Sequence, residues 1–416
     1  MRSFLVAACL APAICPCIAL AQSPAAYVYV AQTDQLKGEP YGTQPIYAYS
    51  VNSEGKVTPV KGSPFTQISG EMVGTNGTHF ITLGYGGDQD SGPLNYLYSY
   101  GVASDGAIGK QASEINTQLY SGPDCAAGDD QIAQGAELDH TGQYLYVPYC
   151  DSAVQTYKIA KSGDLTFQNA TIYDNPDQSF GGLPKLSGNS TFAYNQTIVD
   201  KGPHGFPNTV FASFERESDG TLESRGSPTV AGPSLPENYY SDFYGLLTDD
   251  PTDHFAVMLG LQKFIAPDTT ANEGCALASF TMGGKGQLTS TNSYDDMPLL
   301  PYCGQEMLLS PSGKALAVLT ENGASLLLYH FNGAQPITQF AGLINKSDPF
   351  GAMAWDANNH LYALNSISGK LNVYTVSSTG VVETPGSPYN LPPHCPYDQH
   401  NSMFECPQNL VVRIVP

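Results

Sequence analysis

The residues best suited to acid–base chemistry are one glutamate and three histidines: Glu306, His204, His394 and His400. A carboxylate or an imidazole can take a proton from water near neutral pH. Hydrolysis of an ester needs such a base, together with a donor for the developing oxyanion. Glu306 with one of the histidines is therefore a candidate hydrolytic pair, although a histidine in a loop is also commonly just solvated.

A second set of polar residues recurs at the start of apolar, strand-like segments, often beside glycine. Its members are Glu71, Gln134, Gln305, Gln408 and Asn409, and Glu306 belongs to the same series. Two interpretations fit this set. The side chains can line a small polar ligand site, or they can hydrogen-bond water and the backbone of neighbouring strands.

The segments that carry these residues repeat along the chain. The stretch 351–388 holds four short β-rich pieces separated by Asn, Ser and Gly: Ala352–Asp356, His360–Leu364, Leu371–Val376 and Val381–Thr384. A small-residue turn before a β run recurs about every 54 residues, with turn glycines Gly55, Gly106, Gly163, Gly220, Gly286, Gly333 and Gly380. This period predicts an all-β fold, a seven-bladed β-propeller of four-stranded antiparallel blades.

The two ends of the chain are expected to close the ring together. The first unit has only three strands, Tyr27–Val30, Ile46–Val51 and Lys56–Val60, so its inner edge would stay open. The C-terminal segment Pro407–Val415 resembles the start of a unit. We therefore expect it to supply the inner strand of the first blade, because closure removes exposed strand edges that invite aggregation.

Loop lengths predict two different faces. The long segments Gln32–Gln44, Gly84–Leu94, Asn195–Asn208 and Gly260–Gly274 are expected to join the second and third strands of their units. With the connections between units they form a long-loop face, and six cysteines lie in or beside it. Six cysteines allow 15 pairings. Proximity in the sequence favours Cys125–Cys150, Cys275–Cys303 and Cys395–Cys406.

The N-terminus has the pattern of an export signal. Arg2 precedes the apolar run Phe4–Leu20, and Ala19-Leu20-Ala21 has the small-residue form of a cleavage site. We expect residues 1–21 to be a cleaved signal peptide and residues 22–416 to form one propeller domain, secreted or periplasmic, where disulfides persist. No other segment is long and apolar enough for a membrane span.

The charge balance restricts the partners. The chain has 17 Lys and Arg against 38 Asp and Glu, a net charge of −21, which repels nucleic acid and anionic lipid. A small neutral or sugar-like ligand, or a protein or glycan partner, is compatible with it, and a monomer is expected. No cofactor and no metal cluster is expected. The segment Gly86–Gly92, rich in Gly and Asp, is a candidate structural Ca²⁺ site, although it lacks the distal glutamate of a complete calcium loop.

Several runs resemble a known family. The runs YVYVA at Tyr27–Ala31 and YLYVP at Tyr144–Pro148, with Gly-Ser-Pro-Phe at Gly62–Phe65, resemble the YVTN-type propellers of the lactonase family, named for 6-phosphogluconolactonase. The resemblance covers essentially the whole chain after residue 21. It implies a seven-bladed ring whose axial opening carries any ligand site.

The same resemblance implies basic residues and a glutamate for an acidic substrate. After Arg2, only Arg216, Arg225 and Arg413 remain, and they form no pair that can be carried over. No catalytic residue is transferred from the family, and a phosphorylated substrate is not expected.

Two functions from different classes remain. One is a secreted hydrolase that opens a neutral sugar lactone or similar small ester at the channel mouth, a role that Glu306 and the histidines favour. The other is a non-catalytic binding or scaffold propeller that presents its long-loop face to a protein or glycan. The missing arginines and the glycine-rich strand starts favour the second.

Overall fold

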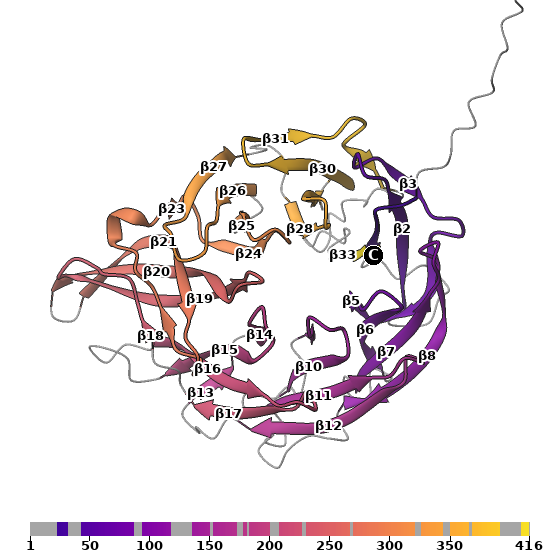
Figure 1. Cartoon of the computed structure of the whole chain (residues 1–416), viewed down its shortest axis with the longest axis horizontal. Coiled ribbons are helices and arrows are strands. Elements are labelled where there is room, and N and C mark those ends of the chain that lie inside the picture. The colour runs from indigo at the N-terminus through magenta and orange to yellow at the C-terminus, as the bar shows by residue number, and fades with distance from the viewer. Residues whose placement is uncertain are drawn as a thin grey trace, which may run out of the picture.

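The computed structural model describes residues 23–31, 43–86, 94–117, 135–149, 153–172, 178–180, 183–199, 208–226, 230–266, 269–320, 326–343, 350–365, 368–391 and 409–415. The chain is an all-β propeller, with four-stranded antiparallel blades arranged around a central opening (Figure 1). The expected signal peptide, residues 1–21, lies outside the described residues.

Strand pairing among the described residues gives seven sheets. The first contains β3 (Val57–Pro59), β2 (Thr43–Val51), β1 (Ala26–Ala31) and β33 (Asn409–Ile414), with β4 (Phe65–Ser69) also on β2. The second contains β5 (Glu71–Thr75), β6 (His79–Gly86), β7 (Leu94–Val102) and β8 (Ile108–Asn116). The third contains β9 (Glu137–Leu138), β10 (Tyr144–Tyr149), β11 (Ala153–Ile159) and β12 (Leu165–Ile172).

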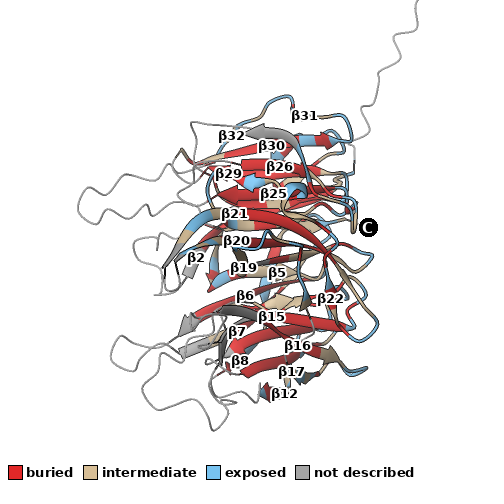
Figure 2. Ribbon diagram, turned by 90° about the vertical axis from the view of Figure 1, so that its left-hand side faces the viewer, coloured by how far each residue is buried: buried red, intermediate tan, exposed pale blue. Residues whose placement is uncertain are grey.

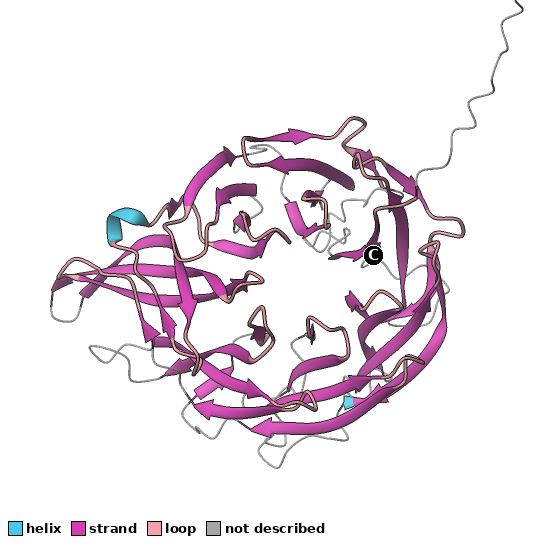
Figure 3. Cartoon of the chain, viewed as in Figure 1, coloured by secondary structure: helices cyan, strands magenta, loops and turns pink. Residues whose placement is uncertain are grey.

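The remaining sheets follow in chain order (Figure 1), and strands account for nearly all of the regular structure (Figure 3). The fourth contains β13 (Gln178–Phe180), β14 (Lys185–Leu186), β15 (Phe192–Val199), β16 (Asn208–Arg216) and β17 (Leu222–Gly226). The fifth contains β19 (Tyr239–Asp249), β20 (His254–Ala266), β21 (Thr269–Met282) and β22 (Leu288–Thr289), joined by β18 (Val230–Ala231) and β23 (Leu299–Leu300), with the 3-10 turn η4 (Tyr294–Asp296) before β23. The sixth contains β24 (Gly304–Leu309), β25 (Ala315–Thr320), β26 (Leu326–His330) and β27 (Thr338–Leu343). The seventh contains β28 (Phe350–Trp355), β29 (His360–Asn365), β30 (Lys370–Ser377), β31 (Gly380–Glu383) and β32 (Tyr389–Asn390).

The two ends of the chain share the first sheet. β33 pairs antiparallel with β1, with Ile414 opposite Ala26 and Asn409 opposite Ala31. The axis end of this sheet is therefore built from the last strand of the chain, next to β5 of the second sheet and β28 of the seventh (Figure 1). None of the helices in the described part of the chain has the length and apolar character to cross a bilayer.

The hydrophobic core is divided into layers between successive sheets. One layer joins the first and second sheets through Tyr29, Phe80 and Tyr100, and another joins the fourth and fifth through Tyr194 and Phe255. The inner parts of the strands are correspondingly buried (Figure 2). Because each sheet buries both faces against its neighbours, the apolar runs of the sequence become stacked layers rather than one central core.

A recurring contact fixes the turn glycines. In six of the sheets, the first or second residue of the second strand carries a ring that lies against the turn glycine of the next sheet. A Cβ atom added to that glycine would contact the ring. The pairs are Tyr27 with Gly106, His79 with Gly163, Tyr144 with Gly220, Phe192 with Gly286, His254 with Gly333, and His360 with Gly55. We call this the ring-on-glycine contact. All six glycines have a positive φ, so glycine is needed both for the turn and for the close approach.

Tyrosine hydroxyls reinforce three of these contacts. Tyr29 donates a hydrogen bond to the carbonyl of Gly106 (3.0 Å), and Tyr146 donates one to Gly220 (2.8 Å). Tyr194 donates one to Gly286 (2.9 Å). The turn motif that marks each unit in the sequence is therefore the element that joins neighbouring sheets.

One predicted loop is a pair of strands instead. The segment Gly260–Gly274 was expected to be a long loop, but β20 and β21 continue through most of it and form a hairpin that extends to the left in Figure 1. β19 continues beside β20, and the rings of Tyr240 and Phe264 lie 4.8 Å apart. Aromatic pairs of this kind stabilise cross-strand pairing, so the strands extend past the edge predicted from turn residues.

The Sγ atoms of Cys275 and Cys303 lie 2.03 Å apart, as in a disulfide. This pair links β21 to the segment between β23 and β24. The other two pairings expected from the sequence involve Cys125, Cys150, Cys395 and Cys406, which lie outside the described residues.

We expect peptide mapping to recover the Cys275–Cys303 bridge. Proteolysis without a reductant should release one linked species that contains both cysteines, and reduction should separate it into two peptides. Recovery of either cysteine as a free thiol, or bridged to a different cysteine, would contradict the arrangement.

Candidate functional site

An axial cavity of about 610 Å³ lies where the inner strands meet. Six sheets contribute to it through residues of β5, β9, β14, β24, β28 and β33 or residues next to these strands. Its polar and charged lining residues are Glu71, Glu137, Lys185, Glu306 and Asn409. The volume falls within the range of roughly 300–1,000 Å³ that is typical of small-molecule sites.

Short inner strands bring the charged residues together. β9 and β14 each contain two residues, and they place Glu137 and Lys185 at the axis although 48 positions separate them in the sequence. Gly135, just before β9, has φ +133° and also lines the cavity. A small residue is suited to this position because several backbones converge on the axis.

Glu306 is the cavity residue whose pKa is shifted close to neutral pH. It is half-buried on β24, and its Oε2 accepts a hydrogen bond from the backbone N–H of Met353 on the neighbouring seventh sheet (3.2 Å). Desolvation raises the pKa of Glu306 to about 7, while that hydrogen bond and the positive charge of Lys185 act in the opposite direction. A carboxylate with this pKa exchanges protons readily at neutral pH.

Lys185 is the basic residue of this cavity. Its Nζ lies 2.9 Å from Oε2 of Glu137 on the third sheet. Desolvation alone would lower the pKa of Lys185, but the charges of Glu137, Glu306 and Asp249 together raise it above its ordinary value. The ammonium therefore stays charged and lies among carboxylates, which makes it suited to interact with a developing negative charge on a ligand.

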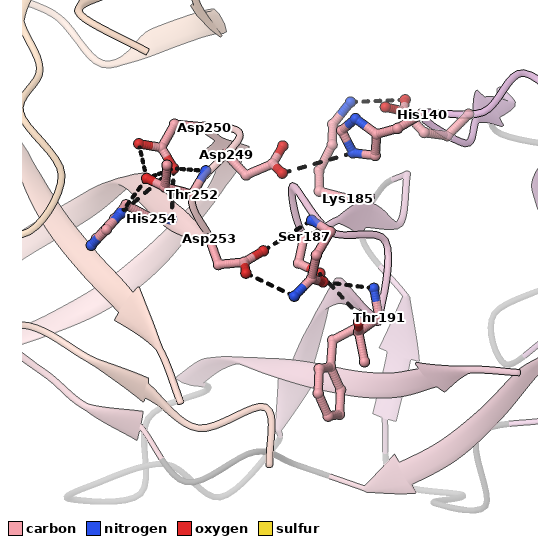
Figure 4. A network of polar contacts seen from close by, with 12 residues as sticks. His140, Lys185, Ser187, Thr191, Asp249, Asp250, Thr252, Asp253 and His254 are labelled. Atoms are coloured by element: carbon pink, nitrogen blue, oxygen red, sulfur yellow. Dashed lines mark hydrogen bonds and ion pairs between the residues drawn. The ribbon is translucent and has the colours of Figure 1, made fainter. Parts of the chain in front are cut away.

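Asp249 and His140 lie beside this pair and point toward one another (Figure 4). Oδ2 of Asp249 is 3.8 Å from Nε2 of His140, and this buried oxygen forms no hydrogen bond with any residue that the structure describes. Burial raises the pKa of Asp249 to about 8; the charge of Glu137 adds to this, and that of Lys185 opposes it. The Asp249 carboxyl is therefore mostly protonated at neutral pH.

This protonation makes stability depend on pH. In the unfolded chain Asp249 loses its proton near its ordinary pKa of 3.8, whereas in the folded chain it keeps the proton up to about pH 8. The folded state thus binds more protons across this interval, so this residue makes stability fall as the pH rises. We expect Asp249→Asn to raise the thermal midpoint near pH 8 and to leave it almost unchanged near pH 4.

The matched control is an aspartate with the opposite shift. Asp219 is exposed, and hydrogen bonds from the side chain and backbone of Thr221 lower its pKa. Asp219→Asn should therefore not raise the midpoint near pH 8. Equal midpoints for Asp249→Asn and the unmutated protein at both pH values would show that Asp249 is not buried as described.

The residues predicted from the sequence have different positions. Glu71 and Asn409 line the cavity with Glu306, whereas Gln305 is exposed and does not line it. The pairing of β24 with β25 shifts between Gly304 and Glu306, and this irregularity places Glu306 rather than Gln305 toward the axis. The remaining predicted residues, Gln134, Gln408, His204, His394 and His400, lie outside the described residues.

Two of the lining residues hydrogen-bond a neighbouring backbone. The amide of Asn409 donates to the carbonyl of Met72 (2.8 Å), and Glu306 accepts from Met353. This matches the interpretation in which the polar residues join adjacent strands. It does not exclude a ligand, because each group has further hydrogen-bonding capacity.

Four residues of the site were missed by sequence reasoning: Glu137, His140, Lys185 and Asp249. Lys185 begins β14, a strand of only two residues that shows no alternating pattern in the sequence. A signal was present, since a lysine close to the expected start of an inner strand is unusual in a chain with only 17 Lys and Arg. Glu137 likewise comes shortly after Gln134, one of the predicted site residues.

No group of three or more His, Cys, Asp and Glu residues in the described part of the chain is placed to hold a metal ion. Most of the candidate calcium segment, residues 87–92 of Gly86–Gly92, lies outside that part.

Comparison of the sequence with protein-family models finds no match, and no curated protein matches it either. Comparison of the structure finds similar folds. A candidate 6-phosphogluconolactonase of Bacteroides fragilis has a TM-score of 0.51 and 9% identity, with 94% of this chain and 98% of that chain covered. A second candidate 6-phosphogluconolactonase, from Bacteroides uniformis, has a TM-score of 0.51 and 12% identity, covering 88% and 96%.

A protein of Lactobacillus plantarum has a TM-score of 0.53 and 11% identity, with 94% of this chain and 99% of that chain covered. Identities this low establish a common fold and carry no residue roles. The chain is therefore an all-β propeller whose architecture is similar to that of lactonase-like proteins.

Proposed function

We propose that this chain is an exported, seven-bladed propeller of the YVTN type that hydrolyses a neutral lactone in its axial cavity. The observation that carries the proposal is Glu306, a carboxyl group with a pKa near 7 in a cavity that also contains Lys185. The fold of the chain and the sequence signals add support.

The number of sheets and their contacts support seven blades in a closed ring. Each of the seven sheets contributes one blade, and β33 supplies the inner strand of the first blade by pairing with β1. The ring-on-glycine contact of His360 with Gly55 joins the seventh sheet to the first in the same way as at the other joints. Such a closed arrangement leaves no open edge between the first and last blades.

Glu306 acts as the general base in the proposed reaction. Its carboxylate takes a proton from water while the water oxygen attacks the lactone carbonyl carbon. The positive charge of Lys185 stabilises the oxyanion that forms. The ring C–O bond then breaks, and the proton held by Glu306 passes to the departing alkoxide, which leaves an open hydroxy acid and restores the carboxylate.

The charges of the cavity favour a neutral substrate. Three carboxylates, Glu71, Glu137 and Glu306, line it with the single ammonium of Lys185, and no arginine is among the lining residues that the structure describes. A phosphorylated lactone would be repelled by this net negative charge. An acidic product is repelled for the same reason, which favours its release.

Export is supported by two separate features. The N-terminal residues have the pattern of a signal peptide. The Cys275–Cys303 pair is of the kind that persists in oxidising compartments. Mass measurement of the mature protein from its native host should give a chain that begins after Ala21.

A panel of neutral aldonolactones tests the reaction. Acid release should be followed at constant pH, beside the same lactones carrying a phosphate, and ligand binding should be measured separately by thermal shift. We expect catalysed opening of a neutral lactone and little activity on the phosphorylated ones. Binding of lactones without acid release would replace the proposal with the second function, a non-catalytic binding propeller.

A further inference from the structure

The joint between the sixth and seventh sheets lacks the ring-on-glycine contact. The second strand of the sixth sheet, β25, begins with Ala315. The corresponding strands of the third and fifth sheets, β10 and β20, begin with Tyr144 and His254. Ala315 is buried and carries no ring. At the other six joints a ring occupies the corresponding place.

The facing turn is altered at the same joint. Gly380 was expected to be a turn glycine, but it pairs with Ser377 at the start of β31, so only two residues form this turn. Gly380 does not have a positive φ, and a Cβ atom built on it would have no neighbour within 4 Å. Both partners of the contact are therefore changed, one by the loss of a ring and the other by a shorter turn.

A pocket of about 610 Å³ lies at this joint. Ala315, Phe331 and Val376 contribute apolar surface, and Ser377 and Ser378 of the short turn line it as well. In Figure 1 the joint lies between β26 and β27 on one side and β30 and β31 on the other. The pocket is separate from the axial cavity, with which it shares no lining residue.

The polar groups of the pocket indicate what it would bind. Lys314 and His330 line it, and none of its lining residues is a carboxylate, although the whole chain carries a net charge of −21. Lys314 is exposed and forms no ion pair with any residue that the structure describes. An anionic group on a ligand would therefore find a positive charge here without a competing acid.

Asn359 forms part of the pocket wall. Its Oδ1 is buried and has no hydrogen-bond partner among the described residues, so a ligand in the pocket does not reach that oxygen. The features that would recognise a ligand are therefore the missing ring and the free ammonium of Lys314.

We propose that this pocket, bounded by Ala315, Lys314, Phe331 and Asn359, binds a small aromatic acid. The ring of the ligand takes the space that a side-chain ring fills at the other joints. Its carboxylate interacts with Lys314. A bound ligand joins the sixth and seventh sheets in the way that Tyr144 and Gly220 join the third and fourth.

Isothermal titration of the full-length protein with 4-hydroxybenzoate tests the proposal. We expect saturable binding, with weaker binding of phenol, which lacks the carboxylate, and of cyclohexanecarboxylate, which lacks the aromatic ring. Ala315→His should lower the affinity at least about tenfold, because its imidazole occupies the ligand's place as at His254. Lys314→Gln, at an exposed position, should lower it severalfold without affecting folding.

A further variant distinguishes this pocket from the axial cavity. Glu306→Gln should bind 4-hydroxybenzoate as the unmutated protein does. Loss of binding in Glu306→Gln with retention in Lys314→Gln would overturn the proposal in favour of the axial cavity. Absence of binding to the unmutated protein, or equal affinities for 4-hydroxybenzoate and phenol, would also overturn it, whether or not the axial cavity hydrolyses lactones.

Discussion

We expect Glu306→Gln to lower kcat/KM for a neutral lactone by about 100-fold or more, the usual contribution of a general base. The substitution is close to isosteric, and the amide oxygen can still accept the hydrogen bond from the Met353 N–H. The variant should therefore fold normally and bind the substrate. What it loses is the ability to take a proton from water.

The pH dependence gives an independent measure of the same group. Desolvation raises the pKa of Glu306 to about 7. The fraction of Glu306 in the carboxylate form therefore rises with pH below that value and approaches one above it. In the unmutated protein kcat/KM should rise about tenfold per pH unit below about pH 7 and level off above it. Glu306→Gln should remove this rise, leaving only the hydroxide-dependent background.

The control for both measurements is a glutamate far from the axial cavity. Glu54 is exposed in the turn after β2, and Glu54→Gln should change neither kcat/KM nor the pH profile. A thermal midpoint within the error of the unmutated protein would show that Glu306→Gln is folded. Full activity in folded Glu306→Gln would remove Glu306 from the mechanism, and the second function would then be favoured.

Most of the strand arrangement could be predicted from the sequence because its signals are local. A turn glycine with positive φ must be a glycine wherever the turn recurs, so Gly106, Gly163 and Gly220 mark the units directly. The hairpin formed by β20 and β21 could not be predicted in this way. Its length depends on the aromatic contact of Phe264 with Tyr240 on another strand, and a single segment does not reveal that partner.

The candidate site was predicted only in part for a related reason. Glu306 could be predicted because a carboxylate at the start of a strand-like segment is a candidate general base. Its neighbours in space come from other sheets: Lys185 from β14, Glu137 from β9 and Asp249 from β19. These positions meet only when the inner strands converge on the axis, and a two-residue strand such as β14 has no periodicity to recognise.

The second prediction concerns the turn glycines and compares three substitutions by alanine. Gly220 has φ +84°, and a Cβ atom there would overlap the ring of Tyr144. Gly77 has φ +89° but no neighbour within 4 Å of such an atom, and Gly380 has neither feature. The three positions thus separate backbone strain from close approach between sheets.

We expect Gly220→Ala to lower the free energy of unfolding by about 2–4 kcal/mol, because left-handed strain costs about 1 kcal/mol and overpacking costs about 1–3 kcal/mol. Gly77→Ala should cost only the strain, about 1 kcal/mol. Gly380→Ala should be neutral within about 0.5 kcal/mol. Denaturant titration followed by circular dichroism measures all three differences under the same conditions.

The order of the three values decides what holds neighbouring blades together. If Gly220→Ala and Gly77→Ala cost the same, the turn conformation alone requires glycine, and the ring of Tyr144 moves aside without loss. If Gly220→Ala costs more, the ring-on-glycine contact itself stabilises the joint, as the hydrogen bond from Tyr146 to the carbonyl of Gly220 indicates. In that case the joint at Ala315, which lacks the contact, should be the least stabilised of the ring, and this is the physical reason for a ligand to bind there.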